Sequence, residues 1–129
     1  MPTHPLDPFA PTAPTRLTRM RLTTPDNKPN PHTMPVFAGI FSAIFYEQAM
    51  DLYGNPTVTT SIATSLLELR DQRKYEQMFV FLCLQYDAMH IPIPDPVWWI
   101  AGNSDVVREF MDAFTTRLCE LVAESEGDT

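Results

Sequence analysis

The distribution of prolines constrains this chain more than any other feature. Nine of its thirteen prolines lie within residues 1–35. The first five recur every three residues, at Pro2, Pro5, Pro8, Pro11 and Pro14. Because proline lacks an amide hydrogen and fixes φ, such a segment joins neither a helix interior nor a central strand. The period matches the three residues per turn of a polyproline II helix, and therefore predicts an extended arm that is either a spacer or a ligand for a groove on another protein.

The remainder of the arm has two parts. In residues 16–22 the cations Arg16, Arg19 and Arg21 alternate loosely with apolar residues, a pattern that suits a short edge strand paired with a partner. Residues 24–31 combine proline, aspartate and asparagine, which predicts a loop. We therefore expect an extended proline-rich arm over residues 1–35 and an acidic helical domain over residues 36–129.

The charge divides at the same point. Residues 1–35 carry four basic and two acidic side chains, a formal charge of +2, and residues 36–129 carry five basic and fourteen acidic side chains, a formal charge of −9. Proteins bind nucleic-acid backbones mainly by neutralising phosphates with lysine and arginine, so we do not expect the acidic domain to bind a nucleic acid. An acidic inhibitor or assembly chaperone that binds a basic protein is the alternative that this charge favours.

The sequence also predicts the compartment. The first twenty residues lack the apolar core of a signal peptide. The longest apolar stretch, residues 36–46, is shorter than the ~20 residues needed to span a bilayer. Cys83 and Cys119 lie inside apolar runs, as buried thiols do. We expect a protein that is cytoplasmic when made, has no membrane segment and needs no cofactor.

Apolar residues recur at helical spacing in four segments. Residues 36–53 form the first, and Gly54-Asn55-Pro56 supplies its C-terminal stop. Its expected apolar face comprises Phe37, Ile40, Phe41, Ile44, Phe45 and Leu52. The second expected helix runs from Thr57 to about Arg70, where Val58, Ile62, Leu66 and Leu69 repeat.

Residues 75–89 form the third expected helix, which is apolar nearly all round because Val80, Phe81 and Leu84 oppose its main apolar face. This pattern predicts the central, buried helix of the domain. Asn103, Ser104 and Asp105 offer N-cap side chains for the last helix, and residues 124–129 at its end are expected to fray. The fold class expected is all-α, a small bundle of about four helices.

Few residues suggest catalysis. Asp87 and His90 form one Asp-x-x-His pair, whereas a di-iron bundle would need two such pairs and two further carboxylates. Glu47 and Asp51, four residues apart, could form an acid–base pair, but a solvated helix face explains them more simply. We therefore expect no enzyme and no bound metal, and keep a small helical-bundle metalloenzyme as a further alternative.

Two features indicate protein binding. Trp98 and Trp99 follow a proline-rich loop and point in different directions, so one closes the core while the other either covers a proline or anchors a partner. The stretch Pro11-Thr12-Ala13-Pro14 resembles the late-domain peptide by which some enveloped viruses engage the budding machinery. The overlapping Pro11-x-x-Pro14-x-Arg16 resembles a class II SH3 ligand. A proline at every third position produces both matches easily, so we favour coincidence for each.

These observations favour a non-enzymatic interaction or assembly component. Its arm is expected to dock on a neighbouring subunit, as in a virion or another large complex, with a protein partner or a second copy of the chain as the occupant. The residues expected to bind the partner are Pro2, Pro5, Pro8, Pro11, Pro14, Arg16, Arg19, Arg21, Trp98 and Trp99.

Overall fold

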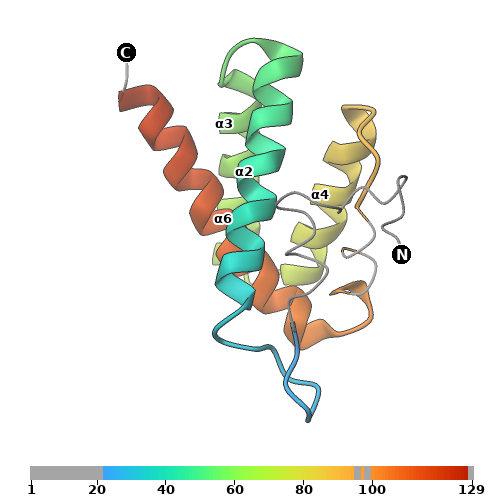
Figure 1. Cartoon of the computed structure of the whole chain (residues 1–129). Helices are drawn as coiled ribbons and strands as arrows, with labels where there is room; N and C mark the ends of the chain where they lie inside the picture. Colours follow the sequence, from blue (N-terminus) through green and yellow to red (C-terminus); the bar gives the residue numbers. More distant parts are fainter. Residues whose placement is uncertain (1–21, 95–96, 98–99, 128–129) are drawn as a thin grey trace, which may run out of the picture.

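A computed structural model describes residues 22–94, 97 and 100–127, and in these ranges the chain folds into four α-helices (Figure 1). They are α2 (Met34–Tyr53), α3 (Thr57–Asp71), α4 (Tyr75–Ala88) and α6 (Ser104–Gly127). The described ranges contain no β-strand apart from an isolated bridge between Thr23 and Pro29. The expectation of a small all-α bundle is therefore confirmed.

Local sequence signals account for the ends of α2. The helix begins at Met34, two residues before the expected start, because Pro35 fits the first helical turn, where no intrahelical amide donor is needed. It ends at Gly54, which has a left-handed φ of 73° and donates its N–H to the carbonyl oxygen of Met50 at 2.8 Å. Glycine adopts this conformation without a Cβ penalty, so the expected stop is confirmed.

The last helix is capped as expected but runs further. The Asn103 side-chain oxygen accepts hydrogen bonds from the N–H groups of Asp105 and Val106, at 3.1 and 3.3 Å, and so satisfies two donors of the first turn. The expected fraying from Glu124 onward is wrong for residues 124–127, which belong to α6, and residues 128–129 lie outside the described ranges. Arg117 donates to Glu120 and Glu124 at 3.1 and 3.4 Å, which links the last two turns.

Phenylalanine rings join α2 to α6 in the core. Phe37, Phe41 and Phe45 of α2 face Phe110 and Phe114 of α6, and all five are buried. Phe110 lies 5.7 Å from Phe37 and 6.0 Å from Phe41 between ring centroids, and Phe114 lies 5.8 Å from Phe45. These distances fall in the range at which tilted and edge-to-face ring pairs attract each other beyond simple burial.

The central helix of the bundle is α6, not the helix over residues 75–89. With 24 residues, α6 contacts α2, α3 and α4, and it crosses the bundle diagonally in Figure 1. The 14-residue α4 packs against α6 and α3 at one edge of the bundle. Val80 and Leu84 are exposed there, so the expected burial of α4 on all sides is wrong. The expected burial of Leu52 is also wrong, since it is 53% exposed near the end of α2.

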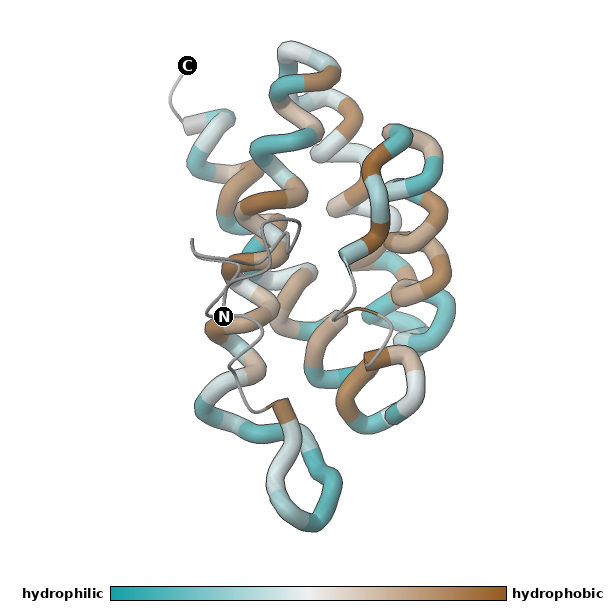
Figure 2. Tube along the Cα trace, turned by 45° about the vertical axis from the view of Figure 1, so that its right-hand side comes forward, coloured by the Kyte–Doolittle hydropathy of each residue, from teal (hydrophilic) through white to brown (hydrophobic). Residues whose placement is uncertain are grey.

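The second half of the expected arm lies on the bundle. Residues 22–30 form a narrow hairpin-like loop, in which the N–H of Asn30 donates to the carbonyl oxygen of Leu22 at 2.9 Å. Leu22 packs against the hydrophobic core, and Met34 is part of it. Figure 2 shows this loop as mostly hydrophilic, whereas apolar residues recur along the helices. The division of the chain at residue 35 stays a prediction, because residues 1–21 lie outside the described ranges.

Replacing Gly39 and Gly54 by alanine should change the free energy of unfolding in opposite directions. A Cβ on Gly39, in the middle of α2, meets no atom within 4 Å, so Gly39→Ala should raise the free energy of unfolding by about 0.5–1 kcal/mol through helix propensity. Gly54→Ala should lower it by about 1 kcal/mol, because the left-handed φ disfavours a Cβ. Urea denaturation of both variants measures the difference, and equal effects would contradict these assignments.

The aromatic contact between α2 and α6 predicts the most sensitive core positions. Phe114→Ala should lower the free energy of unfolding by about 3–5 kcal/mol, because it leaves a cavity beside Phe45. The matched variant Phe81→Ala removes the same atoms from a half-buried position on α4 and should cost clearly less. Chemical denaturation measures both, and equal costs would show that α4 is as central as α6.

Candidate functional site

The outward face of α4 is the candidate site. The inward face of this helix buries Met78, Phe79, Leu82 and Tyr86. On the opposite side Val80 and Leu84, one helical turn apart, are 57% and 58% exposed. An isolated exposed apolar residue is ordinary, but two large ones in adjacent turns form a continuous apolar stripe.

Neighbouring side chains complete this apolar face. Phe81 is half-buried beside Val80 and Leu84, and with Gln77 and Glu76 these residues line one shallow hollow. We define the outer face of α4 as Gln77, Val80, Phe81 and Leu84. Phe81 packs partly against the core, but Val80 and Leu84 remain more than half exposed, so their burial requires another surface.

Charged residues flank the outer face at both ends. Arg73 and Lys74 precede α4 and are exposed, and Asp87 lies exposed in its last turn. Neither Lys74 nor Asp87 forms an ion pair within the described part of the chain. The apolar stripe therefore has the cations Arg73 and Lys74 at its N-terminal end and the anion Asp87 at its C-terminal end. Glu76 is an exception, an acidic residue at the cationic end.

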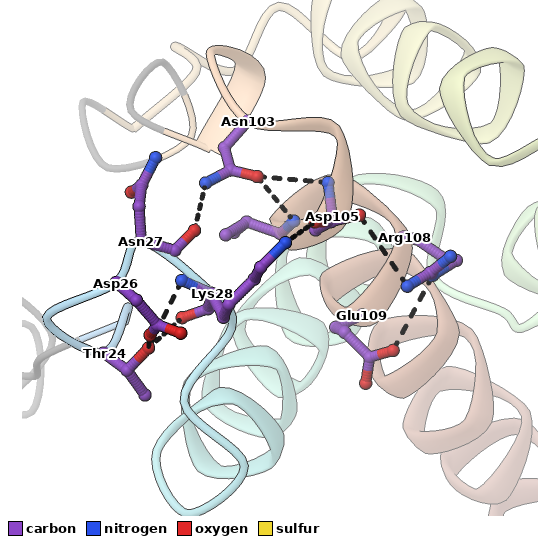
Figure 3. A network of polar contacts seen from close by, with 9 residues as sticks. Thr24, Asp26, Asn27, Lys28, Asn103, Asp105, Arg108 and Glu109 are labelled. Atoms are coloured by element: carbon purple, nitrogen blue, oxygen red, sulfur yellow. Dashed lines mark hydrogen bonds and ion pairs between the residues drawn. The ribbon is translucent and has the colours of Figure 1, made fainter.

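A polar network fixes the loop that precedes α2 (Figure 3). The Lys28 ammonium lies 3.3 Å from a carboxylate oxygen of Asp105, and the Asn103 side chain donates to the carbonyl oxygen of Asn27 at 3.0 Å. Asp105 also pairs with Arg108 at 3.8 Å. These ion pairs are exposed and each contributes little to stability, but together with Leu22 they fix the position of residues 22–30 relative to α6.

The turn inside this loop is held by its own side chains. Thr24 accepts a backbone hydrogen bond from Asn27 at 2.8 Å and bonds through its hydroxyl to the Asp26 carboxylate. Asn27 has a left-handed φ of 63°, a conformation that asparagine tolerates better than most residues. The loop expected over residues 24–31 is therefore a structured turn, and its contacts with Asn103 and Asp105 join it to the N-terminal end of α6.

The partner-binding residues expected from the sequence lie outside the described ranges. They are Pro2, Pro5, Pro8, Pro11, Pro14, Arg16, Arg19, Arg21, Trp98 and Trp99. Val97 and Ile100, which flank the two tryptophans, are buried with 1% exposure each. The role of the arm and the anchoring role of a tryptophan stay predictions.

The residues considered for catalysis are all exposed. Glu47 and Asp51 lie on the surface of α2, Asp87 lies on α4, and His90 follows α4 with a left-handed φ of 57°. His90 is therefore just beyond the helix and not on one of its faces. Among the described residues no three or more histidine, cysteine, aspartate or glutamate side chains are grouped to hold a metal ion.

The two cysteines are free, half-buried thiols. Burial raises the pKa of Cys83 above its ordinary value. Burial also raises the pKa of Cys119, although the nearby Arg70 guanidinium opposes that effect. A raised pKa lowers the fraction of reactive thiolate near neutral pH, which suits structural cysteines.

Comparisons with protein-family models, with curated proteins and with solved structures found no match. Within the described residues, no helix combines the length and the apolar character needed to cross a membrane. The candidate site therefore depends on the geometry of α4 alone.

The outer face of α4 should contribute little to folding. Replacing Val80 and Leu84 together by serine should lower the free energy of unfolding by less than about 1 kcal/mol, because both side chains are already hydrated. Leu82→Ala, on the inward face of the same helix, should cost about 2–5 kcal/mol. Chemical denaturation separates the two cases, and a large loss in the serine variant would mean that this face packs inside the domain.

Proposed function

We propose that this chain is a non-enzymatic assembly component that binds neighbouring subunits. The observation that carries the proposal is the outer face of α4, an apolar stripe on a helix whose opposite side already fills the core. Such a stripe is typical of a surface that a partner covers. A structural role in a virion or another large complex is the setting that we propose.

The N-terminal arm is the second element of this proposal. The described chain begins at Leu22, which is held on the bundle, and twenty-one residues precede it. Extended at about 3.1 Å per residue, these would reach roughly 65 Å, enough to cross onto a neighbouring subunit. The cations Arg16, Arg19 and Arg21 suit an acidic surface, and residues 36–129 carry a formal charge of −9.

The acidic charge also supports a second candidate, an inhibitor or assembly chaperone for a basic protein. Exposed carboxylates at Glu109, Asp112, Glu120 and Glu124 follow α6 along its outer side, although each of the four pairs with one of the arginines Arg108, Arg70 and Arg117. An inhibitor of this kind would keep its activity after removal of the arm, whereas an assembly component would lose part of its association.

Light scattering on the purified protein tests the proposal. We expect the full chain to be heavier than a monomer in a concentration-dependent way, and the mass at a given concentration to fall when residues 2–21 are deleted. It should also fall when Val80 and Leu84 become serine, since both elements contribute contacts. The deletion removes none of the described contacts, so its thermal unfolding should match that of the full chain.

Two controls make the test specific. Val36 and Leu52 are exposed apolar residues of α2, so their replacement by serine removes a similar apolar area without touching α4. Replacing Arg16, Arg19 and Arg21 by glutamine removes the charge of the arm and keeps its prolines. Association that is unchanged by the deletion and by the α4 variant would contradict the proposed function.

A further inference from the structure

The outer face of α4 repeats with the period of a coiled coil. Gln77 and Leu84 are seven residues apart, and so are Val80 and Asp87. Residues seven apart lie nearly in line along a helix, so these four positions form the alternating a and d rows of a heptad seam. Two such helices pack by inserting the side chains of one row between those of the facing helix.

We propose that the outer face of α4 binds α4 of a second copy of this chain, antiparallel about a two-fold axis. This inference rests on the proposed self-assembly and names its surface. A two-fold interface uses the same patch on both subunits, so the patch must be complementary to itself. The outer face of α4, together with the charged residues that flank it, meets this condition.

The apolar residues define the register. The two-fold axis passes midway between Val80 and Leu84. Val80 of each subunit therefore packs against Leu84 of the partner subunit, and symmetry produces this contact twice. Gln77 then faces Asp87 of the partner subunit, and its amide can donate to that carboxylate. Phe81, beside the axis, covers one flank of the contact.

The flanking charges select the antiparallel orientation. Lys74 and Asp87 are separated by thirteen positions, about 20 Å along the helix axis. In this register Lys74 of one subunit lies about one helical turn beyond the level of Asp87 of the partner subunit, within reach of its long side chain, and Arg73 follows it at both ends of the contact. These two cations outnumber Glu76, the one carboxylate that precedes Gln77 in α4. Parallel packing would place like charges together at each end, which is unfavourable.

The same charges argue against the arm as the occupant of this face. Arg16, Arg19 and Arg21 would be attracted to Asp87, but Arg73 and Lys74 at the other end would repel them. A second α4 is complementary at both ends. Because the stripe spans only three turns, its area lies below that of a standard interface, and we expect a weak dimer that dissociates on dilution.

Charge-reversal variants of the full chain test the inference. Sedimentation equilibrium at protein concentrations up to about 1 mM measures the dimer dissociation constant of each variant. Lys74→Glu and Asp87→Lys each convert two attractive contacts into repulsive ones and should raise the dimer dissociation constant roughly fivefold or more. The double variant restores opposite charges across the axis and should return to within about twofold of the unmodified protein. Both single changes suit the dipole of α4, so neither should lower its melting temperature.

Asp51→Lys is the matched control. It makes the same charge change near the end of another helix, α2, and should leave dimerisation unaffected. A similar effect of Asp51→Lys and Asp87→Lys, or a double variant as weak as the single ones, would overturn the antiparallel contact. A mass that stays monomeric up to the highest concentration would overturn it too.

The outcomes separate this inference from the proposed function. If the serine replacements of Val80 and Leu84 weaken association while the charge variants behave like the unmodified protein, the face is used but its occupant is not a second α4. Residues 16–21 are then the occupant if deletion of residues 2–21 has the same effect as the serine replacements. If only that deletion changes the mass, the α4 contact is wrong and the role of the arm survives.

Discussion

The contact between the phenylalanines of α2 and α6 is the interaction on which the other parts of the bundle depend. Phe110 lies against two rings of α2, and Phe45 bridges to Phe114 on α6 and, at 5.3 Å, to Tyr86 on α4. Three helices therefore share one aromatic cluster. Because large rings fill space with few rotamers, they set the spacing of α2 and α6, and the shorter helices pack on what this pair leaves exposed.

The position of α3 follows from that pairing. It packs against α6, α4 and α2, with Ile62 and Leu66 among its buried residues, and a polar contact holds its last turn on α6. The guanidinium of Arg70 donates from one nitrogen to the backbone and side-chain oxygens of Asp112, at 3.2 and 3.1 Å, and to the hydroxyl of Thr116 at 2.8 Å. With α2 and α3 packed on α6, α4 occupies the remaining flank of α6, and the other helices leave one face of α4 uncovered. That remaining face is the proposed interaction surface.

The proposed assembly links two properties of the chain that are otherwise unrelated. The outer face of α4 offers apolar area with opposite charges at its ends, and the arm offers prolines and arginines tied to the bundle at Leu22. Each contact alone would be weak because each is small. A subunit that uses both would bind its neighbours by avidity, since the second contact forms at a high effective concentration once the first exists.

Local patterns in the sequence were sufficient to predict the existence and most boundaries of the four helices. The apolar spacing of α2, the glycine at position 54 and the cap at Asn103 act through neighbours in the chain, so they can be recognised without tertiary structure. The order of the helices in space could not be predicted in this way. The sequence of α4 is apolar on both sides, which suits a central helix and an edge helix with a binding face equally well.

Tertiary packing decided whether α4 is a central helix or an edge helix. The 24-residue α6 contacts all three other helices, so α6 became central, and α4 was left at the edge with Val80 and Leu84 exposed. Periodicity shows which residues of a helix share a face, but burial of that face depends on what other helices already cover. The sequence by itself therefore determined the helices and the acidic, proline-armed character of the chain. The tertiary structure alone decided which apolar face stays exposed.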